Sequence, residues 1–264
     1  MPDEVQAARS RAVLDHVAVG TGTLTDGWEL FGRLLGGTWA YGGNSPGFWW
    51  GQLSFSAGPK VELLTPTGGA DSRFLERFLA ARGPGVHHLN FIVPAIEVTL
   101  GKIRSLGIEP VQTRLEDPRW KEGFLHPRDA YGTVIQVAEQ AGSPPSPGPP
   151  TGLGKPGRAC SFSLVELDVA DIDGACQLFT EALDGEAESR QDTAHGTTVD
   201  VRWPNQAKLR LVQSVASGTP AQQPSGGVTQ LEFSRGDVSF SPAELEVAAA
   251  LSGRLGLSIR LSRQ

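Results

Sequence analysis

The sequence predicts an α+β protein built from paired βαβββ modules, and three observations point to this fold class. A strand, a helix and several strands follow one another early in the chain, and the same order starts again before residue 140. A Pro/Gly-rich segment, Ala141–Arg158, then interrupts the pattern. The remaining residues begin the pattern once more. We therefore expect two tandem domains, residues 1–140 and 159–264, joined by a linker over 141–158.

The first module is predicted to open with a short β-branched strand, Leu14–Val19, that is bounded by glycines. Asp26 is expected to cap the helix that follows, and Gly36 and Gly37 to end it. Apolar runs separated by turn residues then predict strands over 38–41, 48–55 and 60–64 and a short helix over 72–81.

The second module repeats this order about 70 residues later. It should contain a strand over 87–93, a helix that ends at Gly107, and strands over 109–114, 122–125 and 133–137. In the C-terminal part, residues 173–179 echo 26–31, Gly185 falls where Gly37 stops the first helix, and residues 227–233 echo 85–91. We therefore expect the C-terminal domain to be a degenerate copy of the first.

Composition excludes several classes of protein. The 264 residues include 23 Lys+Arg and 29 Asp+Glu, for a net charge of −6, so nucleic acid is not an expected partner. The N-terminus lacks the features of a signal peptide, and no apolar run approaches the roughly 20 residues of a membrane span. Cys160 and Cys176 cannot form a disulfide framework. We expect a cytoplasmic protein with no membrane partner.

Four polar residues occupy matching positions on strands that otherwise look buried. His16 and His88 lie on the first strands of the two modules, and Glu62 and Gln136 lie on the last strands. A buried polar group without a partner costs roughly a few kcal/mol, which coordination of a cation would offset. The pattern therefore predicts a divalent metal site, and mixed N/O ligands suit Mn, Fe, Co, Ni or Zn. The alternative for Gln136 is to orient a ligand or a bound water, because a carboxamide is a weak neutral ligand.

The sequence resembles the vicinal oxygen chelate superfamily of glyoxalases, methylmalonyl-CoA epimerases, extradiol dioxygenases and bleomycin-resistance proteins. Residues 14–18, 61–66, 85–91 and 124–137 carry the resemblance, which is closest to the epimerase branch and covers about residues 13 to 140. It implies the superfamily's fold, with metal ligation by His16, Glu62, His88 and Gln136. The epimerases usually place Gln third and Glu fourth in this set, so the two residues look exchanged here.

One departure from the epimerase pattern concerns the substrate. Those enzymes carry a catalytic Glu on a middle strand of the first module, whereas residues 48–53 contain no acid, which argues against methylmalonyl-CoA. Trp49 and Trp50, with Trp39 and Phe55, would instead make an aromatic wall for a flat or apolar ligand. The residues expected to contact substrate are Trp50, Gln52, Lys60, Asn90 and Phe124.

Glu62 and His126 are the candidate general acids or bases, although His126 is equally compatible with a turn residue. His87 should face away from His88, because side chains alternate along a strand. Glu139 competes with Gln136 as a ligand, but the same alternation turns it to the opposite face.

Three functions stay open at this point. The first is a metal-dependent isomerase, epimerase or lyase that acts through a metal-stabilised enolate on a small substrate with adjacent oxygens. The second is a non-haem Fe(II) extradiol-type dioxygenase, because His16, His88 and Glu62 match its two-His-one-carboxylate triad. The third is a ligand-binding protein similar to the bleomycin-resistance proteins.

The C-terminal copy is expected to lack a metal, because other residues stand where its ligands would be. These are Ser163 or Leu164 in place of His16, Arg210 in place of Glu62, and Gln230 in place of His88. The superfamily builds its site within one chain or across two, so a homodimer is also an open expectation.

Overall fold

The computed structural model describes residues 10–142, 147–214 and 226–262 of the chain. The first module has the predicted βαβββ order. It contains β1 (Val13–Gly20), α2 (Leu24–Gly27) continued by the π-helical segment η1 (Trp28–Leu34), β2 (Thr38–Ser45), β3 (Phe48–Ser54) and β4 (Lys60–Pro66). The helix begins before Asp26, because Thr23 is the N-cap and its Oγ1 accepts a hydrogen bond from the Asp26 amide over 3.4 Å.

A short 3₁₀ segment, η2 (Ala70–Ser72), and α3 (Arg73–Arg82) lead to the second module. This module contains β5 (Gly85–Ile92), α4 (Ile96–Ser105), β6 (Val111–Arg114), β7 (Trp120–Leu125) and β8 (Val134–Gln140). Gly107 follows α4 with φ +81°, a conformation that glycine adopts without strain, so it ends the helix as predicted.

The C-terminal part contains a third complete module and a shorter fourth. The third consists of β9 (Ser161–Asp168), α5 (Ile172–Gln177) with η3 (Leu178–Ala182), β10 (Glu186–Thr193), β11 (Gly196–Arg202) and β12 (Lys208–Ser214). The fourth consists of β13 (Gly227–Ser234), α6 (Pro242–Arg254) and β14 (Ile259–Ser262). None of the helices within the described ranges is both long enough and apolar enough to cross a membrane.

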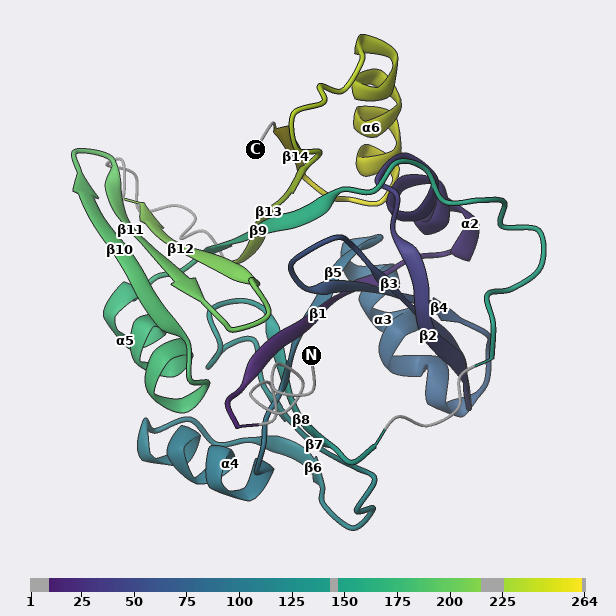
Figure 1. The fold of residues 1–264 in the computed structure, drawn as a ribbon. Helices are drawn as coiled ribbons and strands as arrows, with labels where there is room; N and C mark the ends of the chain where they lie inside the picture. Colours follow the sequence, from purple (N-terminus) through teal and green to yellow (C-terminus); the bar gives the residue numbers. More distant parts are fainter. Residues whose placement is uncertain (1–9, 143–146, 215–225, 263–264) are drawn as a thin grey trace. The chain divides into compact units, whose positions relative to one another are not determined.

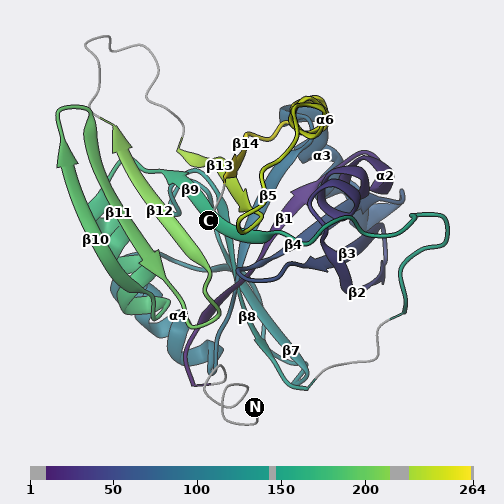
Figure 2. The same cartoon turned by 45° about the horizontal axis from the view of Figure 1, so that its top comes forward.

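The strands form two mixed sheets, so the predicted α+β class is confirmed (Figure 1). One sheet has the order β2-β3-β4-β1-β5-β8-β7-β6, and the other has the order β10-β11-β12-β9-β13-β14. Within each module, a helical crossover makes the first strand parallel to the last one, as in β1 with β4 and β5 with β8. The remaining strands form antiparallel ribbons such as β7 with β8 (Figure 2).

Equivalent backbone bonds in two modules support the internal duplication. Both module helices widen into a π-helical last turn, and both are closed by a glycine whose amide reaches back six residues. Gly37 N donates to Phe31 O over 2.8 Å, and Gly185 N donates to Phe179 O over 2.9 Å. The predicted correspondence between Gly37 and Gly185 is therefore confirmed.

The chain folds into two compact units, each assembled from segments that are distant in the sequence. One comprises His16–His87, Pro144–Ser163 and Gln230–Gln264, and the other comprises Met1–Asp15, His88–Ser143 and Leu164–Thr229. Aromatic packing forms part of the interior of each: Phe31, Phe55, Phe162 and Phe233 in the former, and Phe91, Phe179 and Trp203 in the latter. The predicted domain boundaries at residues 140 and 159 stay a prediction.

The end of the Pro/Gly-rich segment packs against the first module. Part of the predicted linker, 143–146, lies outside the described residues. Gly157 N donates to Gly32 O over 3.0 Å, and Cys160 N donates to Leu35 O over 3.1 Å. Gly36 permits this contact, because it has φ +70° and a Cβ there would collide with Arg158 O. This glycine therefore ends the first helix and also gives the linker backbone room to pack.

Candidate metal centre

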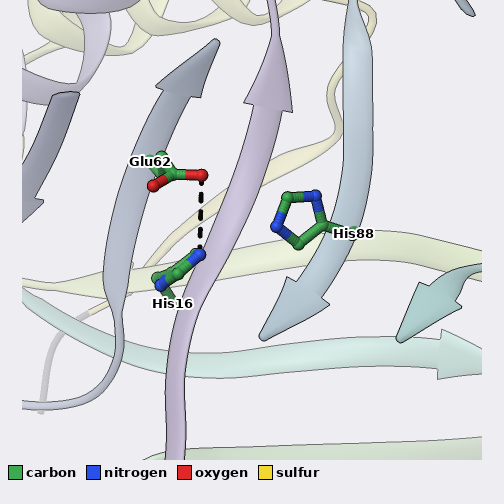
Figure 3. A group of neighbouring side chains, drawn as sticks. All are labelled: His16, Glu62 and His88. Atoms are coloured by element: carbon green, nitrogen blue, oxygen red, sulfur yellow. Dashed lines mark ion pairs between the residues drawn. The ribbon is translucent and has the colours of Figure 1, made fainter. Parts of the chain in front are cut away.

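His16, Glu62 and His88, three of the four predicted ligands, form one group in the structure, and ligation by Gln136 stays a prediction. His16 on β1, Glu62 on β4 and His88 on β5 each offer one ligand atom, and these atoms lie within 4.8 Å of one another (Figure 3). All three residues are buried, with 2%, 8% and 6% of their surface exposed. Because β4, β1 and β5 are neighbours in the sheet, residues of one face on these strands can converge.

Gln52 on β3 holds two of these side chains. It lies opposite Glu62 in the antiparallel β3–β4 ladder. Its Nε2 donates a hydrogen bond to Glu62 Oε1 over 3.0 Å and lies 3.3 Å from His16 Nδ1. Glu62 Oε2 is in turn 3.5 Å from His16 Nε2. The sequence predicts that Gln52 contacts substrate, whereas the structure places it against the ligands themselves.

The chemistry of the donor set fits a divalent transition metal. Two imidazoles and one carboxylate provide two neutral nitrogen donors and one negative charge, a combination used for Zn and for non-haem Fe. His16, Glu62 and His88 are therefore the residues that would hold the ion.

Gln136, the fourth predicted ligand, is buried on β8 and has partners at both ends of its amide. Its Oε1 accepts a hydrogen bond from Asn90 Nδ2 over 2.8 Å, and its Nε2 donates to Glu122 Oε2 over 2.8 Å. Asn90 and Gln136 face each other across the parallel β5–β8 ladder, as Ala18 and Glu62 do across β1–β4. Gln136 thus occupies the position equivalent to Glu62, as the repeat predicts.

Glu122 is a residue that sequence reasoning missed: it lies in the strand predicted over 122–125 but is not among the candidate site residues. It lies on β7 with only 8% of its surface exposed. Besides Gln136, it accepts hydrogen bonds from Trp120 Nε1 over 3.0 Å and Arg114 over 3.1 Å. The alternation of Trp120, Glu122 and Phe124 was the available signal, since it places the acid on the face that Phe124 presents toward Gln136.

The predicted aromatic wall is divided between different neighbours. Trp50 lies on the same face of β3 as Gln52 and packs against Tyr41, at 4.9 Å between ring centroids. Trp49 points to the opposite face and pairs with Trp39 at 5.5 Å. Phe55 packs against Phe162 and Phe233 instead. The expectation of one continuous wall was wrong, because consecutive strand residues face opposite ways.

Two other expected substrate contacts are half-buried on strands that carry ligands or pair with them. Lys60 is the Cα partner of His16 in the β1–β4 ladder. Phe124 is the Cα partner of Gln136 in the β7–β8 ladder. Their contact with substrate stays a prediction.

His126, the second candidate acid or base, is exposed in the turn after β7. Its Nδ1 accepts a hydrogen bond from the Arg128 amide over 3.2 Å, and the Asp129 amide donates to its carbonyl oxygen over 2.9 Å. The structure does not bring it into the group formed by His16, Glu62 and His88.

Two neighbours of the predicted ligands make other contacts. Burial lowers the pKa of His87 to about 4, and its ring packs edge-on against Phe74 and Phe78 at 5.5 and 5.0 Å. Glu139 Oε2 accepts a hydrogen bond from the Ile96 amide over 2.8 Å, where it interacts favourably with the N-terminus of α4. Both residues therefore have structural roles.

In the C-terminal copy, an ion pair takes the place of the ligands. Asp200 and Arg210 face each other across β11–β12, as Gln52 and Glu62 do across β3–β4. The Arg210 guanidinium binds the Asp200 carboxylate through two hydrogen bonds, of 2.7 and 2.8 Å. A cation at this position would repel a metal ion.

Comparisons with solved structures give independent support for the fold. No protein-family model and no curated protein matches the chain. A mutant of 4-hydroxymandelate synthase from Streptomyces coelicolor aligns over 92% of this chain and 76% of its own, with 11% identity and a TM-score of 0.60. That likeness shows the fold.

Two epimerase structures also match, over about half of the chain. Methylmalonyl-CoA epimerase from Mycobacterium tuberculosis is 26% identical over 49% of this chain and 88% of its own, with a TM-score of 0.43. A variant of the Streptomyces coelicolor epimerase, in complex with 2-nitronate-propionyl-CoA, is 21% identical over 50% of this chain and 99% of its own, with a TM-score of 0.44.

Proposed function

Because the chain has the paired βαβββ fold of the vicinal oxygen chelate superfamily, we propose that it is a divalent-metal-dependent enzyme of the isomerase, epimerase or lyase type. The observation that carries the proposal is the buried group of His16, Glu62 and His88, whose ligand atoms lie within 4.8 Å of one another. Its substrate would be a small molecule with two adjacent oxygens.

A divalent ion bound there would act as a Lewis acid, polarising a substrate carbonyl and acidifying the neighbouring C–H. The residues of the chain would then supply orientation and a proton acceptor. Gln52 holds Glu62 Oε1, so we assign the proton-accepting role to Glu62 Oε2, which would leave the metal to take the proton. His126 is a weaker candidate, because it is exposed and its Nδ1 is engaged by the Arg128 amide.

We assign substrate contact to side chains that share strands, or strand ladders, with the ligands. Lys60 would offer a cation to a substrate oxygen, and Trp50 and Phe124 would offer apolar surface. β3 contributes the neutral Gln52 to the group, rather than an acid. This supports the expectation that methylmalonyl-CoA is not the substrate.

The first test of the proposal is metal content. Protein purified without chelator and then repleted with Co²⁺ or Zn²⁺ should bind about one equivalent, and His16→Ala or His88→Ala should abolish the binding. His87→Phe is the matched control, because it changes the adjacent histidine and keeps the packing against Phe74 and Phe78. Less than about 0.2 equivalents in the unmodified protein would favour the ligand-binding alternative.

The second test needs no knowledge of the product. A panel of small 2-hydroxy and 2-oxo acids and acyl thioesters is incubated with the metal-loaded protein in D₂O under argon, and deuterium incorporation next to the carbonyl is followed by NMR. Exchange that requires His88 supports enolate chemistry. An absence of exchange in every compound, combined with strict oxygen dependence of substrate turnover, would refute it.

One observation keeps the Fe(II) oxygenase as a second candidate. His16, His88 and Glu62 make up a two-His-one-carboxylate set, the ligand combination of non-haem Fe(II) oxygenases. The argon experiment separates the two functions, because an oxygenase has no turnover without oxygen.

A further inference from the structure

Three buried side chains of the second module form a hydrogen-bonded chain. Asn90 on β5 donates to Gln136 on β8, and Gln136 donates to Glu122 on β7, both over 2.8 Å. Asn90 is fully buried, and Gln136 and Glu122 are 8% exposed. The equivalent of Asn90 in the first module is Ala18, which has no polar side chain, so the chain is particular to the second module.

The contacts of Glu122 decide which group donates and which accepts in each of these hydrogen bonds. Glu122 also contacts Trp120 Nε1 and the Arg114 guanidinium, which can only donate hydrogen bonds. Glu122 is therefore an acceptor, and Gln136 must turn its NH₂ group toward it. The Gln136 carbonyl then faces Asn90 and accepts from the Asn90 NH₂ group.

This direction leaves one oxygen, Asn90 Oδ1, at the end of the hydrogen-bonded series. With its NH₂ group directed at Gln136, Asn90 keeps its carbonyl oxygen for another partner. Asn90 Oδ1 is buried and accepts no hydrogen bond from any of the residues that the structure describes. A buried acceptor without a donor is costly, which points to a ligand that supplies one.

Asn90 lies on the same face of β5 as His88, two residues further on. Two residues of a strand span about 7 Å, which is the reach of a small molecule held at His88. We infer that Glu122 and Gln136 are positioning residues that present Asn90 Oδ1 as a hydrogen-bond acceptor to the substrate, and that the substrate carries a hydroxyl or amine hydrogen beside its metal-binding oxygens. This inference rests on the proposed function.

Two ligands that differ in one hydrogen-bond donor test it. Glycolate and methoxyacetate offer a metal the same carboxylate and neighbouring oxygen, but only glycolate has a hydroxyl hydrogen. Each is titrated into Co²⁺-loaded protein, and binding is followed in the visible Co²⁺ absorption. The ratio of the methoxyacetate Kd to the glycolate Kd measures the preference for the hydroxyl hydrogen. This ratio should be about ten times larger in the unmodified protein than in Glu122→Gln, which corresponds to one buried hydrogen bond.

The variants are chosen to change only the hydrogen bonds that link Asn90, Gln136 and Glu122. Glu122→Gln is isosteric and lets residue 122 donate as well as accept, so the direction of the chain is no longer set. Arg114→Met removes the exposed partner of Glu122 and should keep the wild-type preference. If Glu122→Gln does not fold, Asn90→Leu gives the same test, because it removes the acceptor at similar volume and should lower the preference equally.

The failure of the inference is distinguishable from failure of the proposed function. Equal preference in the unmodified protein, Glu122→Gln and Asn90→Leu, with Co²⁺ bound in all three, would overturn the inference alone. No Co²⁺ binding at all would overturn the proposed function. In the metal-free protein, the side-chain amide protons of Gln136 should exchange slowly in ¹⁵N spectra and lose this protection in Glu122→Gln. Fast exchange in the unmodified protein would also refute the chain.

Discussion

Gln52 Nε2 donates a hydrogen bond to Glu62 Oε1 over 3.0 Å, so a neutral amide orients the carboxylate of the candidate metal centre. Partners of this kind typically raise metal affinity about 10–100-fold. Gln52→Met should therefore weaken Co²⁺ binding by that factor while leaving one site per chain, as measured by competition with a chelator. Gln140→Met, at the exposed end of β8, is the control. Equal affinities in the two variants would contradict a positioning role for Gln52.

Metal binding should stabilise the folded protein, because His16, Glu62 and His88 come together only on folding. At a free metal concentration of 100 times Kd, the gain in unfolding free energy is about 2.7 kcal/mol. Urea unfolding with Co²⁺ and with chelator measures it. His88→Ala should abolish the difference and His87→Phe should keep it. A difference that survives in His88→Ala would place the ion elsewhere.

Stability should fall in mildly acidic solution because of His87. Burial lowers its pKa from 6.5 to about 4 in the folded protein, so the unfolded chain binds a proton that the folded one resists. The contribution of neutral His87 to the unfolding free energy is fully present above about pH 6.5 and is lost as the pH falls toward 4.

Urea unfolding at pH 7.5 and pH 5 checks the size of this effect. The protein should lose about 2 kcal/mol more between these pH values than His87→Phe loses. His126→Gln, at an exposed histidine, should behave like the unmodified protein. An identical pH dependence in His87→Phe would refute the assignment.

Arg235 depends on Glu244 for its charge partner. The Arg235 side chain is 6% exposed, contacts the Phe240 ring at 4.0 Å and donates to Glu244 Oε1 over 2.6 Å. Glu244→Gln removes the anion that pairs with this guanidinium and should cost about 2 kcal/mol of unfolding free energy at pH 7, less than for a fully buried pair because Glu244 is 34% exposed.

The same contact gives a second measurement on Glu244. Its hydrogen bond from Arg235, together with those from Ser241, lowers the pKa of the Glu244 carboxyl to about 2. Its stabilising effect is therefore present above about pH 4.5 and is lost as the pH falls toward 2. Glu246→Gln, exposed on the same helix, should change neither stability nor its acid dependence. A similar loss in both variants would contradict the pairing.

The sequence did not predict the residue that caps the first helix or the side chains that meet across neighbouring strands. Asp26 was expected to cap the first helix, but Thr23 does so, because its extended backbone lets Oγ1 reach the Asp26 amide. Glu122 is not among the candidate site residues that the sequence predicts, although it is buried against Gln136. Both errors concern which atoms meet, and residue type with spacing does not decide that.

The module order and three residues of the candidate metal centre can be predicted from the amino-acid sequence. Strand periodicity places His16, Glu62 and His88 on buried faces, and duplication makes His16 equivalent to His88 and Glu62 equivalent to Gln136. Burial and equivalence can therefore both be deduced from spacing. The side chains that surround these residues can be identified only from the folded protein. Gln52 meets Glu62, and Gln136 meets Asn90 and Glu122, only after separate strands have paired in register. Cross-strand neighbours depend on that register, which arises from the packing of the whole sheet and is not encoded in any one segment.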